Sequence, residues 1–287
     1  MRWTNGKFVD IGGVKVHYID VGEGPAVLLL HGLGTSLITW QRNVAPLVDA
    51  GYRVLALDLP GHGDSDKPRT LSYDPISGAN LLRQFLDLRE VERASLVGSS
   101  AGGLVVGQFS IAYPDLVDRM VLVAAGGLGR EVCWYLRLMS VPFLGELIYQ
   151  PGLQNPIDLS KRIFYQEPPF LKEVLPEMLR VRNMPGARYA AIQAVRSSIN
   201  LLGLRKQQYI LDQLTGLSKP LMAVWGEEDN IIPAVHAEEV RRAIPHSLVR
   251  VLPQCGHWPH MEKSDEFNDL LVQFFNGDLD NGHRPPE

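Results

Sequence analysis

Cysteine is scarce in this chain, whose 287 residues include only Cys133 and Cys255. Their separation fits neither a Cys-x-x-Cys redox motif nor the ligand spacing of a zinc site. Disulfides are rare in the cytosol, so we expect two reduced thiols in a cytoplasmic protein. No apolar run approaches the length of about 18 residues that a transmembrane helix needs. The N-terminal residues also lack an apolar signal core, so a secreted protein is not expected.

An excess of charge of one sign is also missing. The formal net charge is −4, and the isoelectric point is about 6.1. This balance gives no electrostatic reason to expect nucleic acid or an anionic membrane as a partner. Hydrophobic residues make up 45% of the chain and charged residues 21%, as in ordinary globular proteins. We therefore expect a small-molecule ligand and a monomer or homodimer that does not insert into membranes.

Short apolar strands alternate with helical segments through the first half of the chain. Two strands at 8–10 and 14–19, around a Gly-Gly pair, predict an antiparallel hairpin at a sheet edge. The segments predicted after it are strands at 26–30, 53–57, 94–97 and 120–123, and helices at about 39–49 and 74–88. Such alternation is typical of parallel βαβ units, so the sequence predicts an α/β fold with a doubly wound sheet.

The alternation stops between about residues 128 and 217, where helical patterns occur without a buried-strand run. The strands and helices predicted afterwards are 221–225, 234–243, 248–251 and 264–275. We therefore predict a core made of residues 1–127 and 218–276, with residues 128–217 inserted as a helical lid. The polar segment 277–287, with glycine and paired proline, is predicted to be a disordered tail.

The most informative motif is Gly-Ser-Ser-Ala-Gly at 98–102, a Gly-x-Ser-x-Gly pentapeptide centred on Ser100. It lies between a predicted strand and an apolar helical segment. A serine at such a junction occupies a sharp, strained turn that presents its hydroxyl clear of the backbone. The glycines are needed where a side chain would collide with the neighbouring strand or helix. The pentapeptide alone is weak evidence, because chance supplies about 0.1 such matches per chain.

A nucleophilic serine needs a base, and the base needs an acid that orients it. Asp229 is the predicted acid because it directly follows the strand at 221–225. The loop after the strand at 120–123 offers no acidic residue. An ordinary loop carboxylate is the alternative interpretation, since Glu227 and Glu228 belong to the same loop.

His257 is the predicted base, because it follows the last strand and the preceding Gly256 leaves the loop free to present the imidazole. His260 lies close by as a competitor. The resulting order along the chain is Ser100, Asp229 and His257. This order is typical of one hydrolase fold and differs from the orders in chymotrypsin-like and subtilisin-like proteases.

Two backbone N–H groups are predicted to form an oxyanion hole. One belongs to Ala101, the residue after the nucleophile, and the other to Leu33 in a His-Gly-Leu-Gly loop that follows a buried strand. The loop at 58–65 is interpreted as a structural loop that lines the site. We expect its His62 and Asp64 to be structural rather than catalytic.

Together these motifs resemble the α/β-hydrolase superfamily over nearly the whole chain. They are His31-Gly-Leu-Gly, Asp58-Leu-Pro-Gly-His-Gly-Asp-Ser, Gly98-Ser-Ser100-Ala-Gly, Trp225-Gly-Glu-Glu-Asp229 and Gly256-His257. The resemblance implies an eight-stranded, mostly parallel sheet flanked by helices, with the lid over the pocket and no metal or organic cofactor. Haloalkane dehalogenases and epoxide hydrolases carry aspartate at the nucleophile position, so Ser100 argues against both.

Within the superfamily, the chain looks most like carboxylesterases and lipases. The expected activity is hydrolysis of small to medium hydrophobic esters through an acyl-enzyme on Ser100. Hydrolases of ring meta-cleavage products share Cys-Gly-His-Trp at 255–258, but usually have Asn and Met where this chain has Ser99 and Ala101. Carbon–carbon bond hydrolysis of 2-hydroxy-6-oxo-dienoates is therefore the alternative, followed by a ligand receptor with a hydrolase fold. The predicted substrate contacts are His31, Gly32, Trp134, Met139 and Trp258.

Overall fold

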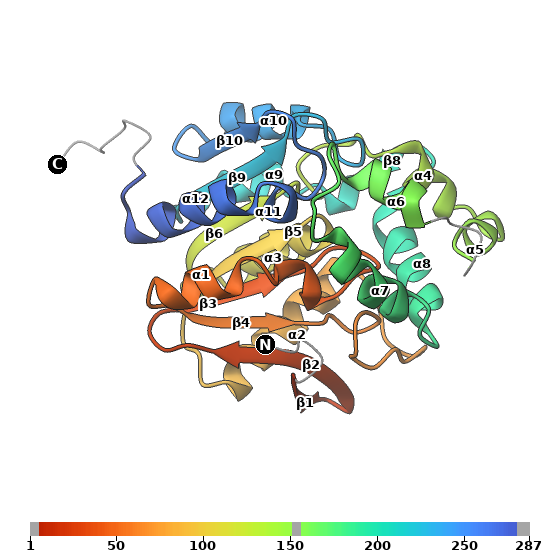
Figure 1. The fold of residues 1–287 in the computed structure, drawn as a ribbon, viewed down its shortest axis with the longest axis horizontal. Coiled ribbons are helices and arrows are strands. Elements are labelled where there is room, and N and C mark those ends of the chain that lie inside the picture. The colour runs from red at the N-terminus through yellow and green to blue at the C-terminus, as the bar shows by residue number, and fades with distance from the viewer. Residues whose placement is uncertain (1–5, 151–155, 280–287) are drawn as a thin grey trace.

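A single sheet of eight strands forms the centre of the molecule (Figure 1). The computed structural model describes residues 6–150 and 156–279. In spatial order the strands are β1 (Lys7–Ile11), β2 (Val14–Val21), β4 (Arg53–Leu57), β3 (Ala26–Leu30), β5 (Ala94–Ser99), β6 (Val117–Val123), β9 (Leu221–Gly226) and β10 (Leu248–Leu252). β2 pairs antiparallel with β1 and β4, and the remaining pairings of this sheet are parallel. The predicted α/β-hydrolase sheet is confirmed.

Both faces of the sheet are buried, which explains why its central strands are continuous apolar runs. Successive residues of a strand point to opposite faces, so Leu28 belongs to one hydrophobic core and Leu29 to the other. The first face is covered by α2 (Pro75–Leu88), α3 (Ala101–Ala112) and α10 (Val235–Ala243), and the second by α1 (Val44–Asp49) and α12 (Ser264–Asn276) (Figure 1). Cys133 and Cys255 are free thiols.

The segment between β6 and β9, here called the lid segment, is mainly helical. Its helices are α4 (Trp134–Met139), α5 (Leu144–Ile148), α6 (Pro156–Ile163), α7 (Leu171–Arg182), α8 (Ala187–Ser198) and α9 (Leu211–Leu214). It also contains two short antiparallel strands of two residues each, β7 (Ile199–Asn200) and β8 (Gly203–Leu204). Helices α4 to α8 lie together beyond the carboxyl ends of β3 and β5 (Figure 1). The boundaries of the lid as a separate unit stay a prediction.

The single helix expected at 39–49 is two elements, the 3₁₀ helix η2 (Leu37–Trp40) and α1. Pro46 explains the break, because a proline has no N–H to donate and fits an α-helix only in its first turn. The side chain of Asn43 bonds instead to distant groups, the backbone oxygen of His260 and the side chain of Asn268. The sequence pattern shows helical spacing but not these long-range bonds.

The chain leaves α12 through Gly277, whose φ of +80° suits glycine. Most of the predicted tail, residues 280–287, lies outside the described residues. Among the residues that are described, no helix combines the length and apolar character needed to cross a membrane.

Candidate active site

Ser100 occupies a strained junction between β5 and α3. Its backbone has φ +55° and ψ −117°, a conformation that residues with side chains rarely adopt. A Cβ atom on Gly98 would lie 2.5 Å from the backbone oxygen of Gly102, and one on Gly102 would lie 2.4 Å from that of His31. The two glycines thus let strand, helix and neighbouring loop approach closely around the serine. Ser100 borders a cavity.

Asp229 and His257 are in direct contact, and both side chains are buried. His257 Nδ1 lies 2.7 Å from Asp229 Oδ2, while Asp229 Oδ1 accepts hydrogen bonds from the backbone N–H groups of Ile231 and Ile232. A carboxylate only accepts, so Nδ1 carries the proton and Nε2 of the neutral ring is an acceptor. No hydrogen bond joins Ser100 to His257 among the described residues. Such bonds are often long in unliganded enzymes and tighten when substrate binds.

The alternative candidates for the acid and the base make other contacts. Glu227 is exposed, and Glu228 Oε2 accepts a hydrogen bond of 2.9 Å from the backbone N–H of Cys255. His260 is fully buried and packs against Trp40, with 4.3 Å between the ring centroids. Of the acids and histidines in these two loops, the structure thus pairs only Asp229 with His257.

Glu262 was not expected to contribute to the site. Its carboxylate accepts hydrogen bonds from the backbone N–H of Gly256 (2.8 Å) and, in the lid segment, from that of Gln166 (2.6 Å). The backbone N–H of His257 donates to the oxygen of Ile163, also in the lid segment, at 2.6 Å. The histidine loop is therefore held partly by the lid segment. The two bonds to the lid segment join residues about a hundred positions apart, so no local pattern indicates them.

The residues predicted for the oxyanion hole border the same cavity as Ser100. Both Leu33 and Ala101 line it, and a Cβ atom on Gly32 would lie 3.1 Å from that of Ser100. Ala101 is the first residue of α3, where N–H groups have no acceptor within the helix. The positive end of the helix dipole at this point favours a developing negative charge.

His31 supports this loop from behind. Its Nε2 accepts a hydrogen bond of 3.0 Å from the backbone N–H of Leu59, so its proton is on Nδ1, which donates to the oxygen of Gly32 at 2.7 Å. Burial lowers the pKa of His31, which keeps the ring neutral. Of the predicted substrate contacts, Gly32 lines the cavity and His31 fixes the loop that carries it.

Three other predicted contacts do not line this cavity. Trp134 is 61% exposed and lies under the guanidinium of Arg162. Met139 is 1% exposed and belongs to the hydrophobic core. Trp258 packs edge-on against Phe164 at 5.6 Å. Apolar residues that pack and apolar residues that line a cavity have the same sequence pattern, which explains the difference.

The cavity has a volume of about 320 Å³ and is mainly apolar. From the lid segment it is lined by Val132, Leu136, Ala194, Val195, Ser198, Ile199 and Leu204, and from the sheet side by residues that include Leu59, Pro60, His62, Leu81, Leu104 and Val105. Among the described residues no lysine or arginine lines it. Apolar walls with few polar groups are typical of small-molecule sites.

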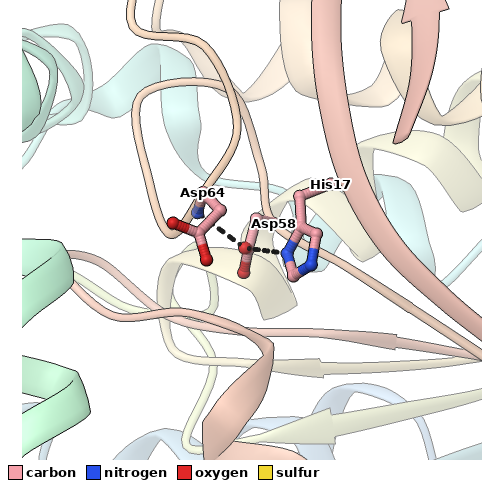
Figure 2. Close-up of side chains that lie close together, drawn as sticks. All are labelled: His17, Asp58 and Asp64. Carbon is pink, nitrogen blue, oxygen red and sulfur yellow. Dashed lines mark hydrogen bonds and ion pairs between the residues drawn. The ribbon is translucent and has the colours of Figure 1, made fainter. Parts of the chain in front are cut away.

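Asp58 anchors the loop at 58–65 (Figure 2). Its Oδ2 accepts hydrogen bonds from His17 Nδ1 (2.7 Å) and the backbone N–H of Asp64 (2.9 Å), and its Oδ1 from the backbone N–H of Leu37 (2.7 Å). Burial alone would raise the pKa of Asp58, but these hydrogen bonds, above all the one from His17, hold it below its usual range. His17, Asp58 and Asp64 are close enough to share a metal ion. Their contacts already use the Asp58 oxygens, and Asp64 pairs with Arg180 at 2.7 Å, so a structural role accounts for all three.

Two buried histidines make stability depend on pH. Burial lowers the pKa of His62 and of His260 to about 3, whereas an unfolded histidine titrates near about 6.5. Between these values the unfolded chain binds more protons than the folded one. The free energy of unfolding therefore falls as the pH drops below about 6.5, and this loss continues towards about 3.

We expect His260→Phe to remove the share of His260 in this loss. Between pH 7 and pH 5, the free energy of unfolding should fall by about 2 kcal/mol less in the variant than in wild type. Urea unfolding of wild type and variant at the two pH values measures the difference. An equal decrease in both proteins would contradict the assignment of this pH dependence to His260.

Comparison with known proteins agrees with this geometry. A family model described as alpha/beta hydrolase fold matches residues 25–264. The 2-hydroxy-6-oxo-6-phenylhexa-2,4-dienoate hydrolase of Comamonas testosteroni is 30% identical over 270 residues, covering 92% of this chain and 92% of that protein.

Solved structures give the same result. The meta-cleavage product hydrolase CumD from Pseudomonas fluorescens IP01 superposes with a TM-score of 0.81 at 27% identity, covering 96% of this chain and 98% of that one. A bacterial membrane phospholipase A superposes with a TM-score of 0.80 at 25% identity, covering 95% and 86%. The chain belongs to the α/β-hydrolase fold family and is a hydrolase.

Proposed function

We propose that Ser100, His257 and Asp229 form the catalytic triad of a hydrolase that breaks a carbon–carbon bond next to a ketone, in a substrate of the 2-hydroxy-6-oxo-dienoate type. The observation that supports this choice is the similarity to a dienoate hydrolase over 92% of both chains. On the basis of Ser99 and Ala101 we expected ester hydrolysis first and carbon–carbon bond hydrolysis second, and this proposal reverses that ranking. Ester hydrolysis becomes the second candidate.

In this proposal the dienol first takes up a proton at C5 and becomes the 2-keto tautomer. Ser100 then attacks the C6 ketone while His257 Nε2 accepts its proton. The Leu33 and Ala101 N–H groups stabilise the oxyanion. The electron pair of the C5–C6 bond leaves into the conjugated C2 carbonyl, so the leaving group is a stabilised enolate. The protonated His257 gives this proton to the departing enolate, and the neutral ring then activates the water that hydrolyses the acyl-enzyme.

Such a substrate carries a carboxylate, and Arg182 of α7 is a suitable partner for it. A Cβ atom on Gly34 of the oxyanion loop would lie 3.6 Å from Arg182 Nη1. The guanidinium lies 3.9 Å from the ring centroid of Tyr149, and the Tyr149 hydroxyl would lie 2.6 Å from the same Cβ atom. Arg182 therefore brings a positive charge from the lid segment close to the loop that would hold the oxyanion. No lysine or arginine is among the described residues that line the cavity itself.

Ester hydrolysis stays a candidate because of one observation, the apolar cavity. A neutral ester needs no cation, and the described lining residues provide none. The structural similarity to a membrane phospholipase A supports the same chemistry. The two candidates share the triad and the acyl-enzyme and differ in the leaving group.

Arg182→Met separates the two candidates. We expect wild type to favour a 6-alkyl dienoate over nitrophenyl butyrate by at least about tenfold in kcat/KM. Losing a hydrogen bond to a charged group costs about 1.5–3 kcal/mol, so the variant should lose about 10- to 100-fold on the dienoate. On the neutral ester its kcat/KM should change less than about twofold, since no carboxylate needs the guanidinium.

Arg242→Met is the matched control, because Arg242 is an exposed arginine of α10 that does not line the cavity. It should behave as wild type on both substrates. A wild-type enzyme that turns over the ester faster than the dienoate would favour the second candidate.

A further inference from the structure

The cavity over Ser100 continues along one face of α2. The residues of this helix and its N-cap that line it are Asp74, Pro75, Ser77, Gly78, Leu81 and Gln84. These residues recur every three or four positions, which is the spacing of side chains on one face of a helix. On the other side the cavity is bordered by Ile11, Gly12 and Val14 of the β1–β2 hairpin. We call this part of the cavity the α2 channel.

The α2 channel is long. A helix rises about 1.5 Å per residue, so the ten steps from Asp74 to Gln84 span about 15 Å. An extended chain advances about 1.2 Å per single bond. A linear chain of about ten to twelve atoms therefore spans the channel.

At position 78, α2 packs closely against α3 beside the channel. A Cβ atom on Gly78 would lie 3.1 Å from both γ-methyl groups of Val105. Val105 lies five residues after Ser100 on α3, which is about 7.5 Å along the helix axis. A chain attached at Ser100 would reach this point after about six bonds. Because Val105 occupies the space next to Gly78, a larger side chain at position 78 would turn into the cavity that both residues line, where it would block long chains and leave short ones unaffected.

The walls of the channel suit methylene groups rather than charges. Asp74 is the acidic residue on the described walls. Its carboxylate accepts hydrogen bonds from the backbone N–H (2.9 Å) and hydroxyl (2.8 Å) of Ser77 and from the hydroxyl of Ser72. These hydrogen bonds satisfy the carboxylate of Asp74 at the start of α2. Leu81, Leu104 and Val105 supply the apolar surface.

The far end of the channel reaches solvent. Gly12 and Gln84 are exposed, whereas Ile11 and Leu81 are buried. A chain longer than the channel can therefore emerge between α2 and the hairpin. This predicts a plateau for chains longer than about twelve atoms, rather than a sharp optimum.

We infer that the acyl side of the substrate is a linear apolar chain of about ten to twelve carbon atoms that lies in the α2 channel. The inference rests on the proposed attack of Ser100 on a carbonyl carbon. It does not depend on whether the bond that breaks is carbon–carbon or carbon–oxygen, because the acyl part is common to both. The product released when the acyl-enzyme is hydrolysed is then a medium- to long-chain carboxylate.

Alkyl fluorophosphonates of graded length test this inference, because they react with a serine nucleophile whatever the natural leaving group is. Each buried methylene is worth up to about fourfold. We therefore expect the second-order inactivation rate constant of wild type to rise at least about tenfold from butyl to dodecyl. Gly78→Leu should keep the butyl rate and lower the dodecyl rate about tenfold or more, since the added side chain is turned into the channel by Val105.

Asn80→Leu is the matched control, because it adds the same side chain to an exposed position of α2 that does not line the channel. Its series should follow wild type. Gln84→Trp at the exposed mouth should lower only the dodecyl rate, and it keeps the test decisive if Gly78→Leu does not fold.

Two failures are distinguishable. A wild-type series independent of chain length, or a Gly78→Leu series that coincides with Asn80→Leu, overturns the α2 channel while Ser100 stays a nucleophile. Failure of every reagent to label Ser100, the shortest included, overturns the proposed function and this inference with it.

Discussion

Ser100→Ala is expected to lower kcat by about 10⁵-fold while leaving the fold intact. The variant lacks the hydroxyl that forms the acyl-enzyme, so only transition-state stabilisation by the oxyanion hole and substrate binding is left. Alanine tolerates the backbone conformation at position 100 about as well as serine does, so stability should change little. Steady-state kinetics on the dienoate and ester, together with thermal unfolding, measure both effects.

Ser99→Ala is the control, because Ser99 is the adjacent residue and is also buried. Its hydroxyl has no hydrogen-bond partner among the described residues. Removing an unsatisfied buried hydroxyl is neutral or stabilising, so this variant should keep wild-type activity. Residual activity of Ser100→Ala within about tenfold of wild type would identify a different nucleophile.

Asp229→Asn is expected to lower kcat by about 10³- to 10⁴-fold. The backbone N–H groups of Ile231 and Ile232 donate to Oδ1, so an asparagine would keep its oxygen there and turn its NH₂ group towards His257. The ring would then accept at Nδ1 and carry its proton on Nε2. In that tautomer His257 cannot take the proton of Ser100.

Glu227→Gln is the control for Asp229→Asn, since Glu227 is an exposed carboxylate two residues away. It should change kcat less than about twofold. A loss in Glu227→Gln comparable to that in Asp229→Asn would show that the general charge of the loop, and not the bond to His257, supports activity.

The sheet and the pairing of Asp229 with His257 could be predicted because both follow from local patterns. Strands such as β3 and β4 are continuous apolar runs, since both of their faces are covered. The acid and the base directly follow strands whose carboxyl ends share one edge of the sheet, where such folds place their sites.

What the sequence did not predict depends on contacts between distant residues. Glu262 bridges the histidine loop and the lid segment, and Arg182 approaches Gly34 from α7. Neither contact leaves a local pattern. The channel face of α2 could not be recognised because Gly78 and Leu81 follow the same helical spacing as core residues.

The choice between ester and carbon–carbon bond hydrolysis has the same origin. Ser99 and Ala101 flank the nucleophile and favoured an esterase, but they shape only the turn around Ser100. In the proposed reaction the leaving group is recognised by the lid segment and by Arg182, which lies beside the loop that carries Leu33. Relatives similar over the whole chain therefore carry more weight than two neighbours of the serine.

The central claim is that Ser100 is the nucleophile and that the pair of Asp229 and His257 activates it. Intact-protein mass spectrometry after treatment with a fluorophosphonate, followed by peptide mapping, tests this claim most directly. We predict one adduct per chain on the peptide that contains residues 98–102, formed equally fast in Ser99→Ala, strongly slowed in Asp229→Asn and absent in Ser100→Ala. An adduct that persists in Ser100→Ala, or the lack of any adduct in wild type, would contradict the account.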